Sequence, residues 1–428
     1  MYLNEHAKPA RDARPQSGSR ANGATPPRGP RIALYSHDTQ GLGHIRRNLL
    51  ISHALCGDGA SPIILLLSGL REASAFAMPA GVDCLTLPSL GKDADGVYYP
   101  RSLGVPMDDL MTMRSRSISA ALQSFVPDVL IVDKVPRGVY DELVPSLAWL
   151  HGNGRTRIIL GLREILDAPS VVAEEWRRGD YAAAIRQYYD RIWVYGDRAV
   201  FDPVHEYAFD PDLASLVRYS GYLNPRDAGD ESTPEVTGTD GTLCLVGGGR
   251  DGLPLAEAFL RGRWSGRGVL VTGPLMADDD RAALHTLATQ RPGVEVREFV
   301  TDPRPLIAGA SKVIAMGGYN TMCEVLAYRK PALIVPRIEP RTEQLIRATR
   351  FAQRGLVDML HPDDLTAPAL TAWIDAELRP MPAARDAIDF AGVERLPELL
   401  REAIGAPGRV VTMAPMGPEP KEPTHVAG

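Results

Sequence analysis

Long apolar stretches are missing from this sequence, since no hydrophobic run reaches the roughly 18 residues that a membrane-spanning helix needs. The first 30 residues also lack the apolar stretch of a secretory signal peptide, and carry charges, prolines and glycines instead. A basic excess is missing too, because 47 Lys and Arg stand against 53 Asp and Glu. Without a clustered basic face, we expect no nucleic acid as a partner.

Cysteine is scarce, with four residues in 428 and no CxxC pair. Zinc sites and disulfide frameworks need clustered or regularly spaced cysteines. We therefore interpret the four as reduced thiols of a cytoplasmic protein: Cys56, Cys84, Cys244 and Cys323. The sequence also lacks HExxH and GxSxG, which argues against a zinc protease and against a serine hydrolase with a nucleophile elbow.

The sequence does contain two series of short apolar runs that alternate with longer helical stretches. Continuous apolar runs are typical of parallel strands buried on both faces, and their alternation with helices indicates βαβ units. In the first series we expect strands at 31–36, 62–68, 82–88, 128–133, 157–162 and 191–196. Helices are expected between them at 44–56, 107–125, 140–150 and 170–188.

The second series begins after residues 224–240, whose Pro, Gly, Asp, Ser and Thr content predicts a linker. Its expected strands are 242–247, 268–273, 294–300, 312–317 and 332–336, and a late helical stretch at 381–404 could pack on either domain. The fold class is thus α/β, with two Rossmann-like doubly wound parallel-sheet domains facing a cleft. We assign the domains to 31–223 and 241–405, and disordered tails to 1–30 and 406–428.

Ligands of open α/β sheets bind beyond the carboxyl ends of the strands, and glycines gather at three such ends. The first is HDTQGLGHIRRN (37–48), where Gly41 and Gly43 can adopt positive φ. His44 would stand at a helix N-terminus, where the dipole favours a neutral imidazole able to act as a base. Arg46 and Arg47 could neutralise a phosphate. The alternative is a glycine turn with a capping histidine.

The second glycine-rich strand end is LVGGGRDG (245–252), at the matching place in the second domain. Backbone amides of Gly247, Gly248 and Gly249 could cradle a pyrophosphate, with Arg250 close by. The loop lacks the Lys-Ser/Thr of a P-loop, so ATP hydrolysis of that kind is not expected. The alternative is a flexible surface loop.

The third is the stretch 315–344, where a strand ends at Gly317 and Gly318 and a helix follows. On this helix Met322, Val325 and Leu326 would face the core, and the other face would carry Asn320, Thr321 and Glu324. A carboxylate one turn into the helix can accept hydrogen bonds from the vicinal hydroxyls of a ribose, although a solvated helix charge is the alternative for Glu324. Glu343 and Gln344 begin another helix within reach of the cleft.

Other charged residues follow first-domain strands: Asp133 and Arg137, and then Arg163, Glu164 and Asp167. Each could contact an acceptor or act as a base, or could equally be a cap or a salt bridge. The acidic run at 277–280 is interpreted as charging a helix N-terminus, not as a metal site.

These motifs resemble glycosyltransferases of family 28 with the GT-B fold, the family of the peptidoglycan lipid II-forming N-acetylglucosaminyltransferase. The most specific likeness is GGYNTMCEVLAYRKPALIVPR and the acid-Gln pair that follows it. The resemblance implies a hexosyl- or N-acetylhexosaminyl-type glycosyltransferase whose second domain holds a nucleotide sugar, a UDP-sugar above all. It implies no metal and no cofactor, since the nucleotide sugar is a substrate.

Carried over by position, the resemblance assigns a role to each candidate residue. Gly317 and Gly318, with Asn320 and Thr321 on the following helix, would approach the diphosphate, as would the loop of Gly247 to Gly249 with Arg250. Glu324 would bind the ribose and the backbone of Phe299 and Val300 the base. Glu343 and Gln344 would contact the donor sugar. His44 would lie at the reacting centre, within the loop of Gly41, Gly43 and Arg47.

The first domain departs from the peptidoglycan enzyme in its loop and in the insert at 88–104. The acceptor therefore stays open among sugar, lipid-linked and small-molecule hydroxyls, and a lipid acceptor would bring the first domain to the inner face of the membrane as a peripheral contact. The alternative function is a UDP-sugar hydrolase resembling that of pseudaminic acid biosynthesis. That enzyme shares a Gly-x-Gly-His-x-x-Arg loop, matched here by Gly41, Gly43, His44 and Arg47, but directs water at the sugar.

Overall fold

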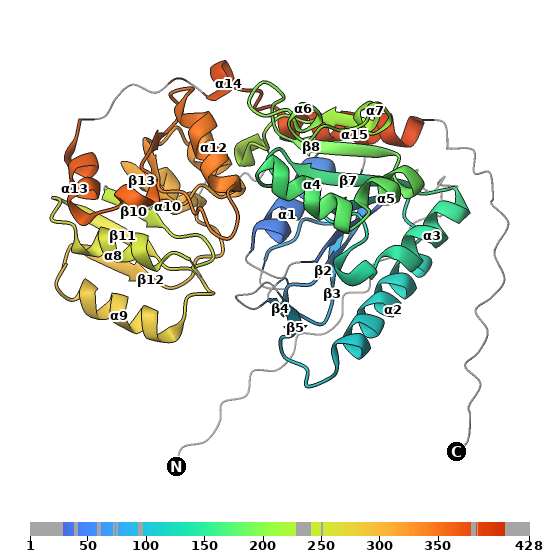
Figure 1. The fold of residues 1–428 in the computed structure, drawn as a ribbon, viewed down its shortest axis with the longest axis horizontal. Coiled ribbons are helices and arrows are strands. Elements are labelled where there is room, and N and C mark those ends of the chain that lie inside the picture. The colour runs from blue at the N-terminus through green and yellow to red at the C-terminus, as the bar shows by residue number, and fades with distance from the viewer. Residues whose placement is uncertain are drawn as a thin grey trace, which may run out of the picture.

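The computed structural model describes residues 29–37, 42–57, 61–71, 73, 76–92, 97–227, 241–249, 251–377, 382 and 384–406. The predicted tails and residues 228–240 of the predicted linker lie outside these ranges, apart from residues 29, 30 and 406. Two α/β units stand side by side, one formed mainly by the first half of the chain and one by the second (Figure 1). The predicted fold class is confirmed.

The first unit is built on a parallel sheet with strand order β3-β2-β1-β6-β7-β8-β9. Its strands are β1 (Arg31–Ser36), β2 (Ile63–Ser68), β3 (Val82–Thr86), β6 (Val129–Asp133), β7 (Arg157–Arg163), β8 (Arg191–Tyr195) and β9 (Val217–Tyr219). Its helices are α1 (Gly43–Cys56), α2 (Met107–Phe125), α3 (Val144–Asn153), α4 (Pro169–Arg178), α5 (Tyr181–Tyr188), α6 (Pro203–Glu206) and α7 (Pro211–Leu216). A small antiparallel hairpin joins β4 (Leu90–Lys92) to β5 (Tyr98–Pro100).

The apolar runs form this sheet because their alternate side chains are buried against helices on both faces. Leu34 and Ile131 belong to a cluster with Ile45 of α1, whereas Ala33 and Leu130 belong to another with α2 and α3. β3 is different, because it lies at the sheet edge and its residues are only half-buried or exposed. The expectation that it would be buried on both faces was wrong, since an edge strand has one neighbour.

The predicted helix at 170–188 was also wrong in one respect, because it forms two helices, α4 and α5. Gly179 ends the first, and Asp180 precedes the second with a φ of +47°. A non-glycine residue in the left-handed region cannot continue a right-handed helix, so the chain turns there.

The second unit has a parallel sheet in the order β12-β11-β10-β13-β14-β15. The strands are β10 (Gly241–Leu245), β11 (Arg267–Val271), β12 (Val294–Arg297), β13 (Lys312–Ala315), β14 (Ala332–Ile334) and β15 (Asp358–Met359). The helices are α8 (Leu253–Arg261), α9 (Asp278–Ala288), α10 (Arg304–Gly309), α11 (Tyr319–Ala327), α12 (Glu343–Ala352) and α13 (Ala367–Asp375), after which the chain continues into α14 (Ala384–Ala387) and α15 (Gly392–Gly405). The acidic run forms the first turn of α9, as expected.

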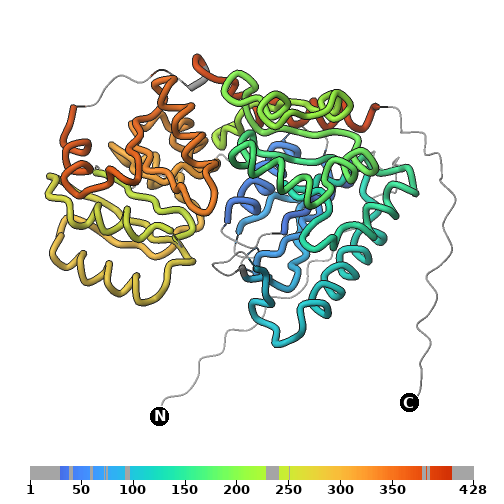
Figure 2. The backbone as a smooth tube through the Cα atoms, in the orientation of Figure 1, coloured from blue at the N-terminus to red at the C-terminus, as the bar shows by residue number. Residues whose placement is uncertain are grey.

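The chain returns to the first unit at its end, where α15 packs against α1. Figure 2 shows that this final red segment leaves the second unit and lies along the top of the first. Leu396 and Leu400 of α15 join one apolar cluster with residues of both sheets. Tyr222, Tyr319 and Phe351 extend this cluster across the boundary, with Tyr222 stacked on Tyr319 at 6.1 Å between ring centroids. The two units therefore share a core.

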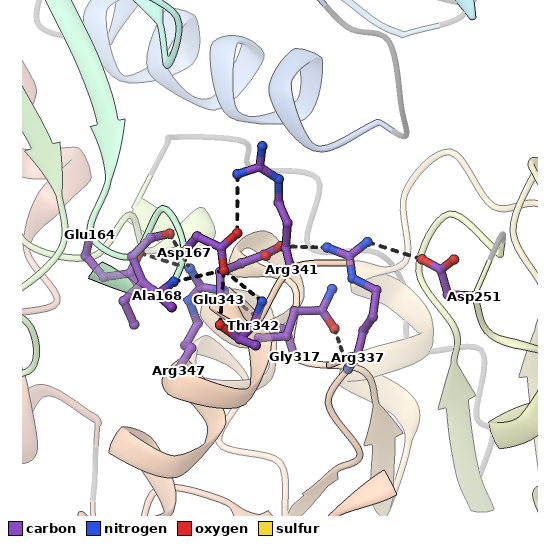
Figure 3. A network of polar contacts seen from close by, with 12 residues as sticks. Glu164, Asp167, Ala168, Asp251, Gly317, Arg337, Arg341, Thr342, Glu343 and Arg347 are labelled. Atoms are coloured by element: carbon purple, nitrogen blue, oxygen red, sulfur yellow. Dashed lines mark hydrogen bonds and ion pairs between the residues drawn. The ribbon is translucent and has the colours of Figure 1, made fainter. Parts of the chain in front are cut away.

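A fully buried ion pair also crosses the boundary, between Glu164 after β7 and Arg347 of α12. Arg347 Nε donates to Glu164 Oε1 at 2.6 Å, and its Nη1 donates to the backbone oxygen of Gly317 at 3.3 Å. Beside it, the backbone and hydroxyl of Thr342 donate to Asp167 Oδ1 at 2.8 and 3.0 Å. Figure 3 shows this network, in which the end of β7 meets the start of α12. The carboxyl ends of both sheets are thereby brought together.

We expect Arg347→Met to destabilise the protein by about 3–5 kcal/mol, because Glu164 would remain buried without a partner. The double variant Glu164→Gln, Arg347→Met should lose less than the sum of the two single variants. Equilibrium urea unfolding measures both. The exposed pair of Glu174 and Arg177 provides the control, and Arg177→Met should leave the unfolding midpoint unchanged. An equal loss of unfolding free energy in Arg347→Met and Arg177→Met would contradict a stabilising role of the buried ion pair.

Candidate active site

A cavity lies between the two units, at the carboxyl ends of both parallel sheets. This is where ligands bind in open α/β sheets. The structure brings thirteen of the predicted residues to its wall: Gly43, Arg46, Arg47, Arg163, Gly247, Gly248, Gly249, Phe299, Val300, Gly318, Asn320, Thr321 and Gln344. His44, Gly317, Glu324 and Glu343 are not in its lining. Gly41 and Arg250 lie outside the described residues.

The loop after β10 depends on glycine at two places. Gly247 and Gly249 have φ values of +64° and +93°, which favour glycine over other residues. A Cβ at Gly249 would also stand 2.2 Å from the backbone oxygen of Thr272. These glycines keep the backbone close to the cavity, without side chains in the way.

The N-terminus of α11 opens onto the same cavity, with Gly318 at the N-cap and no acidic residue in the first turn. The free backbone N–H groups of a helix N-terminus attract anions, and the helix dipole adds to that attraction. Asn320 in this turn donates from Nδ2 to the backbone oxygen of Gly43 at 3.0 Å. The start of α11 in the second unit is therefore tied directly to the start of α1 in the first.

His44 is the second residue of α1, as predicted, and its side chain is 17% exposed. Gly43 begins the helix and does not use the positive φ that a glycine can adopt, because a helical residue has a negative φ. His44 Nδ1 lies 2.7 Å from Oδ2 of Asp133, at the end of β6. Arg47 Nη2 lies 3.0 Å from the same Nδ1. Because an ionised carboxylate can only accept, the shorter contact to Asp133 favours a proton on Nδ1, which leaves Nε2 of a neutral ring free to take one.

Asp133 is buried and is shared by two partners, because Arg47 Nη2 also donates to its Oδ2. Burial by itself would raise the pKa of Asp133, but the charges and hydrogen bonds of Arg47 and His44 outweigh it and hold the pKa below its usual range. Asp133 is therefore an ionised orienting partner of His44. Of the alternatives left open for this residue, the ion pair is the one that forms.

A second histidine, His37, lies beside this pair with its ring 5.1 Å from that of His44. It is buried, and its Nδ1 has no hydrogen-bond partner. Burial is the main reason that the pKa of His37 lies well below its usual value, and the neighbouring His44 and the charge of Lys134 lower it further. His37 is consequently neutral and adds no charge to the site.

Glu324 is buried, so the alternative of a solvated helix charge is wrong. It pairs with Arg46 of α1 across the boundary, in a cavity that adjoins the first one. Burial raises the pKa of Glu324, against the opposing charge of Arg46, and its Oε2 has no partner. A buried acceptor without a donor can take a hydrogen bond from a ligand hydroxyl.

Glu343 and Gln344 begin α12 as predicted, and both are held by Arg337 after β14. Arg337 Nη2 donates to Glu343 Oε1 at 2.8 Å, and its backbone N–H donates to Gln344 Oε1 at 3.1 Å. Burial would raise the pKa of Glu343, but Arg163 and Arg337 lower it below the usual value. Gln344 reaches the cavity wall, whereas Glu343 stands behind it.

Several charged residues have structural contacts instead of the ligand contacts that were left open for them. Glu164 and Asp167 hold the domain boundary, and Arg137 pairs with Asp141 at the surface. Lys134 and Asp251 were missed, although each directly follows a residue that was singled out, Asp133 and Arg250. A strand-end position was the only signal for Lys134.

Comparisons with known proteins agree with this architecture. The chain resembles the solved glycotransferase of kitacinnamycin, with a TM-score of 0.52 and 18% identity over 88% of this chain and 95% of that one. It also resembles a UDP-glucosyltransferase from Polygonum tinctorium capable of glucosylating indoxyl, with a TM-score of 0.54 and 13% identity over 90% and 96%. Two facing Rossmann-like units of this kind define the GT-B fold of glycosyltransferases.

The similarity to a known family lies in the second unit. Residues 269–389 match the model of the glycosyltransferase family 28 C-terminal domain. A curated protein from Streptococcus pyogenes serotype M49 (strain NZ131), UDP-N-acetylglucosamine--N-acetylmuramyl-(pentapeptide) pyrophosphoryl-undecaprenol N-acetylglucosamine transferase, is 46% identical over 72 residues. The match covers 16% of this chain and 20% of that enzyme, so the chain matches about a fifth of the length of the relative. Residues 269–389 are therefore similar to the C-terminal domain of family 28 glycosyltransferases, and the chain as a whole has the GT-B fold, as the resemblance implied.

We expect Asp133→Asn to destabilise the protein at pH 7, because Arg47 would stay buried without its carboxylate. The folded-state pKa of Asp133 lies below the unfolded value of about 3.9, so its stabilisation is complete above that pH and is lost as the pH falls. The difference in unfolding free energy between wild type and variant should shrink by about 1 kcal/mol between pH 7 and pH 3. Urea unfolding at the two pH values measures it, and a difference that does not change with pH would count against the ion pair.

Proposed function

We propose that the protein is a glycosyltransferase that moves a sugar from a nucleotide sugar, a UDP-sugar above all, to an acceptor hydroxyl. The observation that carries this proposal is the bond from Asn320 to the backbone of Gly43. It joins the anion-attracting start of α11 to the turn that presents His44, whose Nδ1 is held by Asp133. A donor site and a candidate base therefore meet at one cavity.

The donor is proposed to bind mainly to the second unit. Its diphosphate would lie against the backbone of Gly247 to Gly249 and the N-terminus of α11, at Gly318, Asn320 and Thr321, where N–H groups attract anions. Phe299 is 42% exposed and, with Val300, supplies apolar wall for the base. Glu324 has a free buried oxygen for a ribose hydroxyl, and Gln344, with Glu343 behind it, would contact the sugar.

The proposed step uses His44 Nε2 to take the proton of the acceptor hydroxyl, while the acceptor oxygen bonds to the anomeric carbon. The bond from that carbon to the phosphate oxygen breaks, and the nucleoside diphosphate leaves with the electron pair. Asp133 stabilises the imidazolium that forms. The diphosphate charge would be stabilised by the amides of α11 and of the glycine loop, and this assignment requires no metal or cofactor.

The names of the relatives bear on the sugar and the acceptor. The curated relatives are N-acetylglucosamine transferases, so we propose a hexosyl or N-acetylhexosaminyl donor. The acceptor would be a sugar, lipid-linked or small-molecule hydroxyl, and a lipid acceptor would be met at the inner face of the membrane. Among the described residues, no helix has the length and hydrophobicity to span a bilayer.

We expect His44→Ala to lower the rate of UDP release from a UDP-sugar about 100-fold or more in the presence of an accepted hydroxyl, because general-base catalysis contributes about that much. The affinity for UDP, measured by isothermal titration calorimetry, should hardly change. A variant that loses UDP affinity and rate together would contradict the assignment of a base. The full chain should also be incubated with UDP-sugars alone. Free sugar formed from UDP-sugar and water at a comparable rate would support the hydrolase instead of the transferase.

A further inference from the structure

Two cations of the first unit, Lys134 and Arg163, lie at the carboxyl ends of the neighbouring strands β6 and β7, and neither has a role in the chemistry proposed above. Within the part of the chain that the structure describes, neither side chain forms an ion pair or a hydrogen bond. Both are partly buried. A cation that is withdrawn from water without a partner is costly, so two of them at one place need an explanation.

The fold places these two cations at the same edge of the sheet. Lys134 directly follows Asp133 at the end of β6, and its backbone N–H donates to the oxygen of Gly161 in β7 at 2.9 Å. Arg163 is the last residue of β7 and lines the interdomain cavity. Lys134 has a φ of +68°, in the left-handed region that non-glycine residues rarely occupy. The backbone is thus strained where the lysine is presented.

The neighbouring arginines differ from these two, because each is matched by carboxylates. Arg47 pairs with Asp133, Arg347 with Glu164, and Arg337 with Glu343 and Asp251. Arg341 pairs with Asp167 and Glu175. Figure 3 shows the last three arginines in contact with carboxylates along the domain boundary. The carboxylates of this region are therefore engaged by other cations.

The charge environment of Lys134 and Arg163 agrees with a site for an anion. Burial, and then the charge of Arg341, lowers the pKa of Lys134 to about 8, while Glu175 and Glu343 act in the opposite direction. Burial lowers the pKa of Arg163 as well, with a further contribution from Arg347 and Arg47 and an opposing one from Glu343. A bound anion would offset both effects.

We propose that Lys134 and Arg163 bind a carboxylate or phosphate group of a substrate, distinct from the diphosphate of the donor. This inference rests on the proposed function, because it takes the loop of Gly247 to Gly249 and the start of α11 as the diphosphate site. Arg163 lines that cavity from the first unit, whereas Lys134 lies outside its lining and adjoins Asp133, the partner of His44. The anion would therefore lie beside the reacting centre, on the side of the first unit.

Such an anion has two chemical sources. It is either a carboxylate carried by the donor sugar, as in a uronic acid, or a phosphate or carboxylate carried by the acceptor. In both cases Arg163 supplies a planar fork and Lys134 a point charge to the same group, which fixes the orientation of the substrate near His44.

The test uses isothermal titration calorimetry on the full chain and on Lys134→Asn and Arg163→Gln. Asparagine tolerates the left-handed region, so the first variant removes the charge without adding backbone strain. Arg163→Lys keeps the charge and should keep part of the binding. Arg155→Gln, at an exposed arginine away from the cleft, is the matched control. Circular dichroism verifies that each variant folds. If Arg163→Gln does not fold, the affinities of Lys134→Asn and Arg163→Lys decide the test.

Three titrations separate the outcomes. UDP alone should bind the wild type, Lys134→Asn and Arg163→Gln with the same affinity. In the wild type we expect one of two results: UDP-glucuronate binds about tenfold more tightly than UDP-glucose, or inorganic phosphate binds the UDP-saturated protein. Whichever is found, the preference for UDP-glucuronate or the affinity for phosphate should fall about tenfold in both variants. The first result assigns the anion to the sugar, and the second to the acceptor.

Two results would overturn the inference while leaving the proposed function in place. One is a wild type that binds UDP but neither prefers UDP-glucuronate to UDP-glucose nor binds inorganic phosphate. The other is a loss of affinity for UDP itself in both variants, which would assign the two cations to the donor diphosphate. If UDP does not bind the wild type at all, the proposed function fails. Phosphate binding to the wild type without UDP, weakened about tenfold in both variants, would even then support an anion site at these residues.

Discussion

The buried ion pair between Glu164 and Arg347 is the interaction on which the candidate site depends. Both side chains are fully buried, and they join residues that are 183 positions apart in the chain. The apolar contacts of the shared core are non-directional and could be satisfied by small rotations of one unit against the other. A charged pair with hydrogen bonds allows much less freedom, so it sets how the end of β7 faces the start of α12.

The remaining site geometry follows from that alignment. With α12 held over β7, Arg337 can hold Glu343 and Gln344, and α11 beside it can reach Gly43 through Asn320. Asp133 then holds His44 at the start of α1, near the anion-attracting end of α11. In the proposed reaction each unit would supply one half, with an acceptor base in the first and a site for a charged leaving group in the second.

Sequence patterns predicted the elements with regular periodicity and the glycine-rich strand ends. The predicted strand 31–36 and helix 107–125 have the same limits in the structure, because their apolar residues follow one period without interruption. Short elements such as β9 and β15 were missed, since three or two residues carry no periodic signal. The hairpin of β4 and β5 lies in the insert at 88–104, where no alternation of apolar and polar residues predicted strands.

The pairing of charges could not be predicted in the same way. Glu324 occupies a polar face of α11, and spacing alone cannot tell a face toward water from a face toward another unit. Its partner Arg46 is 278 positions away in the chain. Asp133 was one of several strand-end acids, and only the fold selects it as the partner of His44. Local patterns therefore locate the site, whereas the contacts across the boundary assign what each side chain does.

The central claim is that a nucleotide sugar binds between the two units with its anomeric carbon beside His44. A crystal structure of the full chain with an unreactive UDP-sugar analogue tests it most directly. The account predicts diphosphate oxygens on the backbone N–H groups at the start of α11, ribose hydroxyls on Glu324, and His44 Nε2 facing the anomeric carbon across the space for one hydroxyl. A nucleotide bound elsewhere, or bound with its sugar pointing away from His44 and Asp133, would contradict it.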